Sequence, residues 1–211
     1  MKSSFSLIGE QLALFRGDRL LFKQCNFDLS NGETLQIKGE NGAGKTSLLR
    51  MICGFLDPDE GKLNFNQTSL LKDRSEFYQQ TLYLGHQLGI KSNLTVAENL
   101  AFYIEINGAS QRCDISEAVD KVGLAGFENQ LVAHLSQGQK RRVTLARLLL
   151  EEAVLWILDE PFVALDVKGQ HWLQNTLGEH AKAGGGIILT SHQAIELEVP
   201  IKSLTLQGGG Q

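Results

Sequence analysis

An eight-residue stretch combines three glycines with a lysine and a threonine, and this combination can hold phosphate. It reads Gly39-Glu40-Asn41-Gly42-Ala43-Gly44-Lys45-Thr46 and is followed by Ser47. Phosphate oxygens need backbone N–H groups at close range, and glycines leave out the side chains that would stand in the way. Lys45 can reach the outer phosphates, and the Thr46 hydroxyl can ligate Mg²⁺. The stretch therefore predicts a site for the phosphates of a nucleotide.

Two carboxylates follow an apolar run much later in the chain. Residues 154–158 are all apolar, which is typical of a strand buried on both faces, and Asp159 and Glu160 come directly after them. We expect Asp159 to hold Mg²⁺ opposite Thr46. Glu160 is not needed for the metal, and its carboxylate is suited to polarise an attacking water.

Two further polar residues follow apolar runs, at the edge where the phosphates should lie. His192 comes after the strand predicted at residues 187–190, and we expect it to contact the γ-phosphate as a second catalytic residue. Gln87 comes after the run at residues 82–84. A loop glutamine alone is more often simply solvated, so its role depends on the other motifs.

A polar turn at residues 135–139, Leu135-Ser136-Gln137-Gly138-Gln139, opens a predicted helix. This turn has no phosphate-binding loop in its own half of the chain. It makes chemical sense if Ser136 and the helix N-terminus face a nucleotide that a second copy holds. The run therefore predicts a dimer.

Four cations follow the turn on one predicted helix: Lys140, Arg141, Arg142 and Arg147. We interpret them as a solvated face that pairs with Glu151 and Glu152. The net charge of −4 also argues against a nucleic-acid partner. Three cysteines, Cys25, Cys53 and Cys113, are interpreted as reduced thiols.

The 211 residues fit a single α/β domain with helices inserted between residues 86 and 135. Residues 5–37 are predicted to be rich in strands, and shorter strands are predicted at 62–65, 82–84, 154–158 and 187–189. Helices are predicted at 45–53, after a Thr95–Glu98 capping box, and at 114–124, 136–150 and 166–181. No window of about 18 apolar residues is present, so we expect any membrane role to come through a partner.

The order of these motifs resembles that of an ABC-type ATPase. The segments that match are residues 39–46, Gln87, residues 135–139, residues 155–161, Ala164-Leu165-Asp166 and His192. The resemblance implies a P-loop NTPase core with a mixed sheet, an N-terminal antiparallel β subdomain and an inserted α-helical subdomain. In this division residues 1–85 and 136–211 form a RecA-like core with the β subdomain, and residues 86–135 form the helical subdomain.

The same resemblance implies a head-to-tail homodimer with two ATP molecules between the subunits. Ser136, Gln137, Gly138 and Gln139 would contact the partner's ATP, and Asp166 would lie at the dimer contact. Gln87 would ligate Mg²⁺ with Thr46 and Asp159 and would link the nucleotide site to a membrane partner.

Three positions depart from the family's usual pattern. Gln137 stands where the family signature has glycine, and Glu40 stands where proline is commoner. The aromatic residue expected to stack on adenine is either Phe15 or replaced, one register further, by Arg16.

A closer resemblance is to the ATP-binding subunit of the cytochrome c maturation system, the CcmA family. It rests on Arg19-Leu20-Leu21-Phe22, residues 40–50, Gln139-Lys140-Arg141-Arg142-Val143, residues 156–162 and Thr190-Ser191-His192-Gln193. This resemblance implies an ATPase beneath integral membrane permease subunits, on the cytoplasmic face of the bacterial inner membrane. Its work would be haem export or release of the haem chaperone.

Three other functions stay open at this point. The chain could serve an ABC exporter of another substrate, such as a lipid, drug or peptide. A soluble ABC-type ATPase acting on DNA or ribosomes would need a coiled-coil insertion or a second ATPase domain, and neither is present in this sequence. A nucleotide-binding regulator without hydrolysis is disfavoured by Glu160 and His192.

Overall fold

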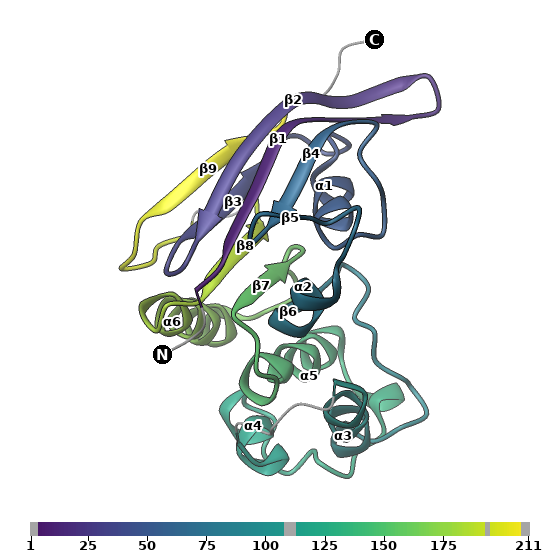
Figure 1. Cartoon of the computed structure of the whole chain (residues 1–211). Helices are drawn as coiled ribbons and strands as arrows, with labels where there is room; N and C mark the ends of the chain where they lie inside the picture. Colours follow the sequence, from purple (N-terminus) through teal and green to yellow (C-terminus); the bar gives the residue numbers. More distant parts are fainter. Residues whose placement is uncertain (1–3, 108–112, 193–194, 208–211) are drawn as a thin grey trace.

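The computed structural model describes residues 4–107, 113–192 and 195–207, whose strands form two sheets (Figure 1). The first sheet has five strands in the order β6-β7-β8-β3-β9. Every neighbouring pair in it is parallel. Its strands are β3 (Thr34–Lys38), β6 (Thr81–Leu84), β7 (Leu155–Leu158), β8 (Gly186–Thr190) and β9 (Ile201–Thr205).

The second sheet is antiparallel and has the order β2-β1-β4-β5. Its strands are β1 (Ser6–Arg16), β2 (Arg19–Ser30), β4 (Glu60–Phe65) and β5 (Thr68–Ser69). The core sheet, which was predicted to be mixed, is therefore parallel among its described strands, and the antiparallel sheet matches the predicted β subdomain. Parallel pairs need long crossover connections, whereas the short turn at Gly17 permits the antiparallel pair β1–β2.

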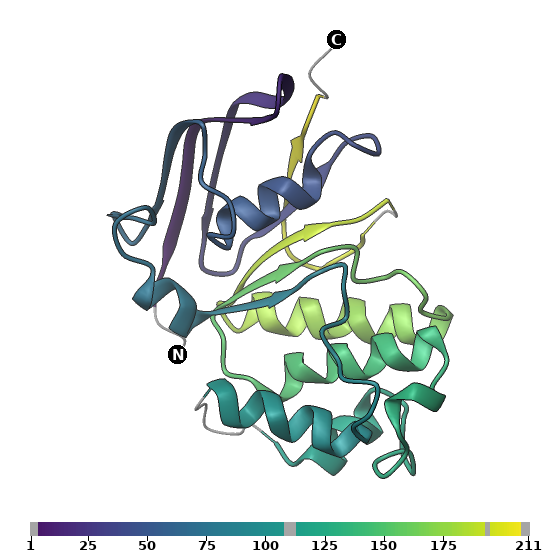
Figure 2. The same cartoon turned by 90° about the vertical axis from the view of Figure 1, so that its right-hand side faces the viewer.

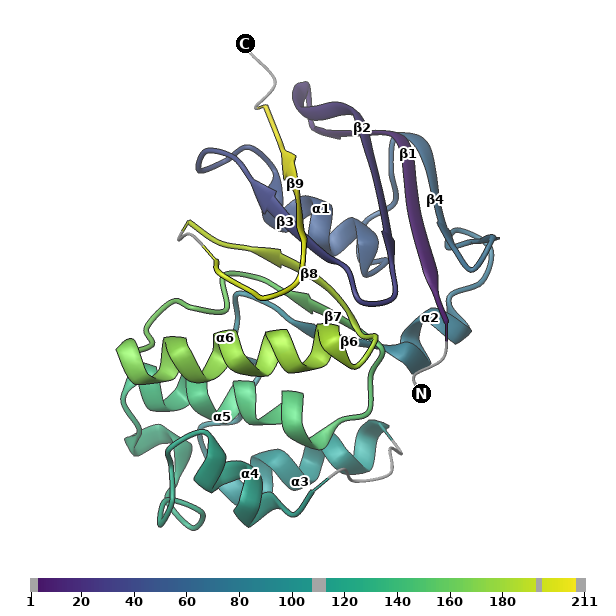
Figure 3. The ribbon, with the colours of Figure 1, turned by 90° about the vertical axis from the view of Figure 1, so that its left-hand side faces the viewer.

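The parallel sheet is covered on both faces (Figures 2 and 3). Leu155 and Ile157 of β7 pack with helix α1 (Lys45–Ile52) and the antiparallel sheet. Trp156 and Leu158 pack on the other face with α5 (Gln137–Leu150) and α6 (Val167–Lys182). All four residues of β7 are buried, as the unbroken apolar run predicts.

Helices α3 (Val96–Asn107) and α4 (Ile115–Lys121) pack against α5 around a third cluster of buried side chains. The Thr95–Glu98 capping box is confirmed, since the Glu98 N–H donates to Thr95 Oγ1 and the Thr95 N–H donates to Glu98 Oε2. The third cluster includes Val143 of α5, beyond residue 135. The subdomain boundaries therefore stay a prediction.

One predicted helix ends too late, and two short helices were not predicted. Helix α4 ends at Lys121, three residues before the predicted end, because Gly123 has a φ of 74° that a helix does not accommodate. The sequence analysis also missed α2 (Ser75–Gln80) and the short 3₁₀ helix η1 (Val132–His134). Among the described helices, none has the length and apolar composition needed to cross a bilayer.

Candidate nucleotide-binding site

The glycine-rich loop connects β3 to α1 and lines a cavity of about 400 Å³. Gly39 has a φ of 150°, and a Cβ there would lie 2.8 Å from the carbonyl oxygen of Leu206. Gly44 has a φ of 96° and precedes the first residue of α1, whose N-terminus has no side-chain cap. The loop therefore needs glycine, and the uncapped N–H groups at the helix start suit an anion. The loop residues that line the cavity are Asn41, Gly42, Gly44, Lys45, Thr46 and Ser47.

Lys45 is buried, and its side chain folds back over the loop. Its Nζ donates to the carbonyl oxygens of Gly39 at 2.9 Å and Glu40 at 3.2 Å. Glu40 thus contributes a carbonyl to this network while its own side chain is exposed. Ala43 is buried behind the loop, where it supports the turn.

Thr46 and Asp159 meet across 113 residues of sequence, as predicted. The Thr46 hydroxyl donates to Asp159 Oδ2 at 2.9 Å, and the Thr190 hydroxyl donates to Asp159 Oδ1 at 2.7 Å. Asp159 is 1% exposed. A hydroxyl beside a buried carboxylate is a hard-oxygen donor pair, and its chemistry fits Mg²⁺.

Glu160 and His192 both line the phosphate cavity. His192 Nε2 lies 3.4 Å from Glu160 Oε1, which is within ion-pair reach, and the His192 side chain is 56% exposed. That contact lacks hydrogen-bond geometry, so the buried Glu160 Oε1 has no hydrogen-bond partner among the described residues. A buried carboxylate oxygen with spare acceptor capacity can take a hydrogen bond from a water in the cavity.

Gln87 is exposed and lines a neighbouring cavity of about 750 Å³, which it shares with Thr46. The aromatic side chains of Phe55, Tyr83 and Tyr103 line the same cavity. His86 lines both this cavity and the phosphate cavity, a position that the sequence analysis missed. The only sequence signal was its place directly before Gln87.

Ser136 caps α5 through a complete capping box with Gln139. Ser136 Oγ accepts from the Gln139 N–H at 3.2 Å, and Gln139 Oε1 accepts from the Ser136 N–H at 2.9 Å. Because Oγ acts as the acceptor in this cap, its O–H stays available as a donor. Ser136 and Gln137 are both exposed. A Cβ at Gly138 would lie 2.8 Å from the carbonyl oxygen of Ala164, so this position needs glycine.

The prediction of a solvated basic face on α5 is wrong for all three of its arginines. Arg141 is 4% exposed and donates to the carbonyl oxygens of residues 85, 159, 160 and 161. Burial lowers the pKa of Arg141, while the nearby carboxylates of Asp159 and Glu160 raise it. Arg142 donates to the carbonyl oxygen of Val122 and forms an ion pair with Asp166.

Arg147 pairs with Glu151 one helical turn away, as predicted, but the pair is not solvated, because the two side chains are 12% and 6% exposed and Arg147 lies over the Tyr103 ring. The partners of Arg141 and Arg142 lie at least 18 residues away in sequence and became visible only in the fold.

Asp166 caps α6 by accepting from the Gly169 N–H at 2.8 Å. This backbone hydrogen bond, together with Arg142 and Lys168, lowers the pKa of Asp166. Its side chain is nevertheless 66% exposed. The described contacts thus make Asp166 a helix cap, and its predicted place at a dimer contact stays a prediction.

Arg16 lines the phosphate cavity together with Leu21. Phe15 is 45% exposed and is not among the described residues that line this cavity. Of the two alternatives left open by the sequence, the structure places Arg16 beside the loop. Gln193, the last residue of the matched segments, lies outside the described residues.

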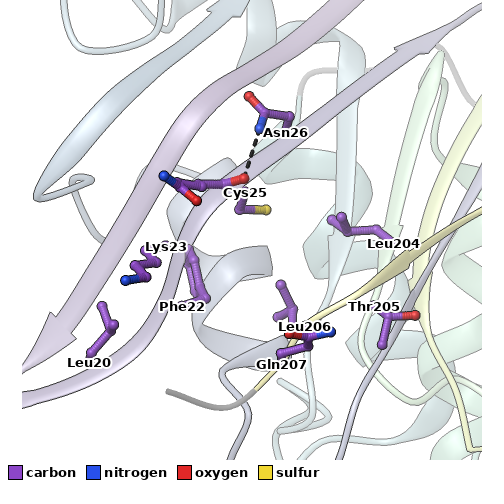
Figure 4. A pocket seen from close by; sticks show the side chains of 10 residues that line it. Leu20, Phe22, Lys23, Cys25, Asn26, Leu204, Thr205, Leu206 and Gln207 are labelled. Atoms are coloured by element: carbon purple, nitrogen blue, oxygen red, sulfur yellow. Dashed lines mark hydrogen bonds between the residues drawn. The ribbon is translucent and has the colours of Figure 1, made fainter. Parts of the chain in front are cut away.

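A further cleft, of about 560 Å³, lies between the edge strands β2 and β9 (Figure 4). Phe22, Cys25 and Leu206 line it, and the Asn26 side chain donates to the carbonyl oxygen of Gln24 at its rim. It contains neither the glycine-rich loop nor the paired carboxylates, so it is not the candidate nucleotide site.

None of the three cysteines takes part in a disulfide among the described residues, in agreement with the prediction of reduced thiols. Burial raises the pKa of Cys25 to about 11 and also raises the pKa of Cys53. Both thiols therefore stay protonated and act as small apolar core residues.

The sequence pattern of the ABC transporter family matches residues 22–163. The chain belongs to this family. A solved structure titled as a putative ABC transporter ATP-binding protein from Pyrococcus furiosus is similar to it, with a TM-score of 0.80 at 25% identity. That match covers 95% of this chain and 97% of the other.

Proteins with higher sequence identity identify a narrower family within the ABC transporters. The cytochrome c biogenesis ATP-binding export protein CcmA of Yersinia pseudotuberculosis is 47% identical over 187 residues, which covers 89% of this chain and 86% of the relative. The CcmA protein of Mannheimia succiniciproducens is 45% identical over 207 residues, which covers 98% and 94%. This ABC ATPase therefore belongs to the CcmA family, and the predicted fold class and family are confirmed.

Proposed function

We propose that this ABC ATPase is the ATP-hydrolysing subunit of a cytochrome c maturation complex, where it powers haem export or release of the haem chaperone. The observation that carries the proposal is the 45–47% identity to CcmA relatives over about nine-tenths of the chain. Lipid, drug and peptide exporters remain the alternative, and no contact in the described structure favours one of them.

The geometry around the phosphate loop supports the proposed nucleotide roles. Lys45 and the loop N–H groups bind the phosphates of ATP, and Thr46 and Asp159 hold Mg²⁺, with Gln87 beside them. When bound, Mg²⁺ neutralises negative charge on the phosphates. Glu160 accepts a proton from the attacking water at its carboxylate, and His192 contacts the γ-phosphate.

The active form in this proposal is a head-to-tail homodimer. The exposed start of α5 supports it, because the Ser136 O–H is free to donate and Gly138 keeps the turn compact. Ser136, Gln137, Gly138 and Gln139 of one copy then face the ATP held by the other, and Asp166 lies near the contact.

The membrane partner in this proposal is a set of integral permease subunits, on the cytoplasmic face of the inner membrane. The cavity beside Gln87 supports this contact, because it adjoins Thr46 and is lined by three aromatic side chains. Aromatic side chains are enriched where proteins bind each other. No nucleic acid takes part.

Affinity purification from detergent-solubilised membranes tests the proposal. The tagged chain should co-purify with permease subunits and a haem chaperone, and recovery with an unrelated permease would overturn the specific function. A matched strain that carries Lys45→Met should lose covalent haem in its c-type cytochromes while retaining b-type haem. Normal c-type cytochromes in that strain would contradict the proposal.

A further inference from the structure

Two buried side chains form hydrogen bonds to the main chain of Glu160, one to its N–H and one to its carbonyl oxygen. Its N–H donates to the Thr190 hydroxyl at 2.8 Å, and its carbonyl oxygen accepts from Arg141 Nη2 at 2.6 Å. Between these two hydrogen bonds Glu160 has a φ of 48°. A residue with a side chain rarely adopts this left-handed conformation, and it persists only where its surroundings enforce it.

Arg141 makes more hydrogen bonds to the main chain around Glu160 than Thr190 does. Its guanidinium donates to the carbonyl oxygens of Asp159 at 2.9 Å, Glu160 at 2.6 Å, Pro161 at 3.2 Å and Gly85 at 3.4 Å. A guanidinium is the one side-chain group that offers five donors in a fixed plane. One buried side chain thus fixes three consecutive carbonyls of the loop after β7 and a fourth carbonyl after β6.

The position of Arg141 on α5 connects these hydrogen bonds to the start of that helix. Arg141 lies five residues after Ser136, the exposed cap of the same helix. It is not among the described residues that line the phosphate cavity, so it acts on Glu160 and not on the nucleotide. A rigid helix therefore joins the surface proposed to meet the partner's ATP to the loop that carries Glu160.

We propose that Arg141 is a positioning residue for Glu160, which holds the loop main chain so that the Glu160 carboxylate faces the phosphate cavity. This inference rests on the proposed role of Glu160 in hydrolysis. Movement of the α5 start on contact with a partner's nucleotide would be transmitted to Glu160 through the same guanidinium.

Replacing Arg141 with lysine retains the charge but removes the planar fork. We expect Arg141→Lys to lower kcat for ATP hydrolysis by about 10- to 100-fold, because small misplacements of a catalytic group have effects of this size. The KM for ATP should change by less than about threefold, since the loop that binds phosphate is untouched. A rise in KM at constant kcat would overturn the proposal.

Arg74→Lys provides the matched control. Arg74 is a partly buried arginine that, like Arg141, donates to a backbone carbonyl, that of Gly54, and it pairs with Asp57. The same substitution there should leave kcat unchanged. An equal loss of kcat in both variants would mean that any buried arginine supports the fold in this way, and it would overturn the positioning role.

A double-mutant cycle separates positioning from general stability. If Arg141 acts through Glu160, then adding Arg141→Lys to Glu160→Gln should lower the residual single-turnover rate by less than about twofold. A full further loss of 10- to 100-fold would overturn the proposal. Should Arg141→Lys fail to fold, Arg141→Gln takes its place in the same cycle, with folding checked by circular dichroism.

The outcomes also distinguish the two proposals. Near-normal turnover of Glu160→Gln would remove the proposed catalytic role and the positioning role with it. A large loss in Glu160→Gln together with normal turnover of Arg141→Lys would overturn the positioning role alone.

Discussion

Two helix starts define the chemistry of this chain, and they are built in opposite ways. Helix α1 begins after Gly44 without any side-chain cap, whereas α5 begins at Ser136 with a complete capping box. The first start leaves its backbone N–H groups for a phosphate, and the second satisfies its own donors and presents a hydroxyl instead. In the proposed function the first binds phosphate by itself, while the second contributes only when another molecule brings a phosphate to it.

The largest expected effect concerns the site at the start of α1, where the chain is proposed to bind its own nucleotide. We expect Glu160→Gln to lower kcat by about 10²–10⁴-fold, because the amide cannot accept a proton from water. ATP binding should persist, since the phosphate loop is unchanged, and a fluorescent nucleotide titration checks this. Turnover close to that of the unmodified chain would contradict the catalytic role proposed for Glu160.

A smaller effect is expected at the capped start. Gly138→Ala should lower ATP hydrolysis about tenfold, because its Cβ would press on the Ala164 carbonyl at 2.8 Å and displace the first turn of α5. Gly178→Ala is the matched control, since a Cβ there meets nothing within 4 Å. That control should retain activity and gain about 0.5–1 kcal/mol of stability. Equal activity of the two variants would show that the close approach is unimportant.

Gln137→Gly should act on association and not on folding. Gln137 is exposed beside Ser136, so we expect its removal to tighten ATP-dependent dimerisation a few-fold while leaving the melting temperature unchanged. Analytical ultracentrifugation with Glu160→Gln as the background measures this, because hydrolysis is then slow. Weaker dimerisation would mean that the Gln137 side chain makes a favourable contact in the dimer.

The smallest expected effect is a difference in pH dependence between a helix cap with a charged side chain and a helix cap with a neutral one. Hydrogen bonds from the backbone and side chain of Thr95 lower the pKa of Glu98 at the start of α3. A lowered folded-state pKa contributes stability above the unfolded pKa and loses it as pH falls through the folded value, so the loss begins below about pH 4.5. The α5 box uses Gln139 and cannot titrate. Chemical-shift titration should show early fraying at the start of α3 but not at the start of α5, and Glu98→Gln should abolish this difference.

The sequence predicts the contiguous parts of the site well. The loop at residues 39–46, the strand before Asp159 and the capped start at Ser136 each depend on neighbours within a few residues, and the structure has all three. The meeting of Thr46 with Asp159 was also predictable, because parallel strands bring their carboxyl ends to one edge.

Other contacts between distant segments could not be predicted. Arg141 has an ordinary place in a basic run, and its burial depends on carbonyls that two other segments bring to it, the one after β6 and the one after β7. His86 likewise acquires its place between two cavities from the packing of β6 against α5. The left-handed main chain at Glu160 has no sequence signal, because glutamate has no preference for that conformation.

The alternation of side chains along β7 has a consequence for motion. Residues on one face of this strand belong to one hydrophobic cluster and residues on the other face to a second cluster, and the strand leads directly to Asp159. A fluctuation that displaces the carboxylates must loosen both clusters together. The start of α5, by contrast, borders the third cluster through Leu135. Backbone amides of β7 should therefore exchange with deuterium far more slowly than those around Ser136. Rigid β7 then carries the residues proposed for the chemistry, and the less rigid start of α5 carries those proposed to meet a partner.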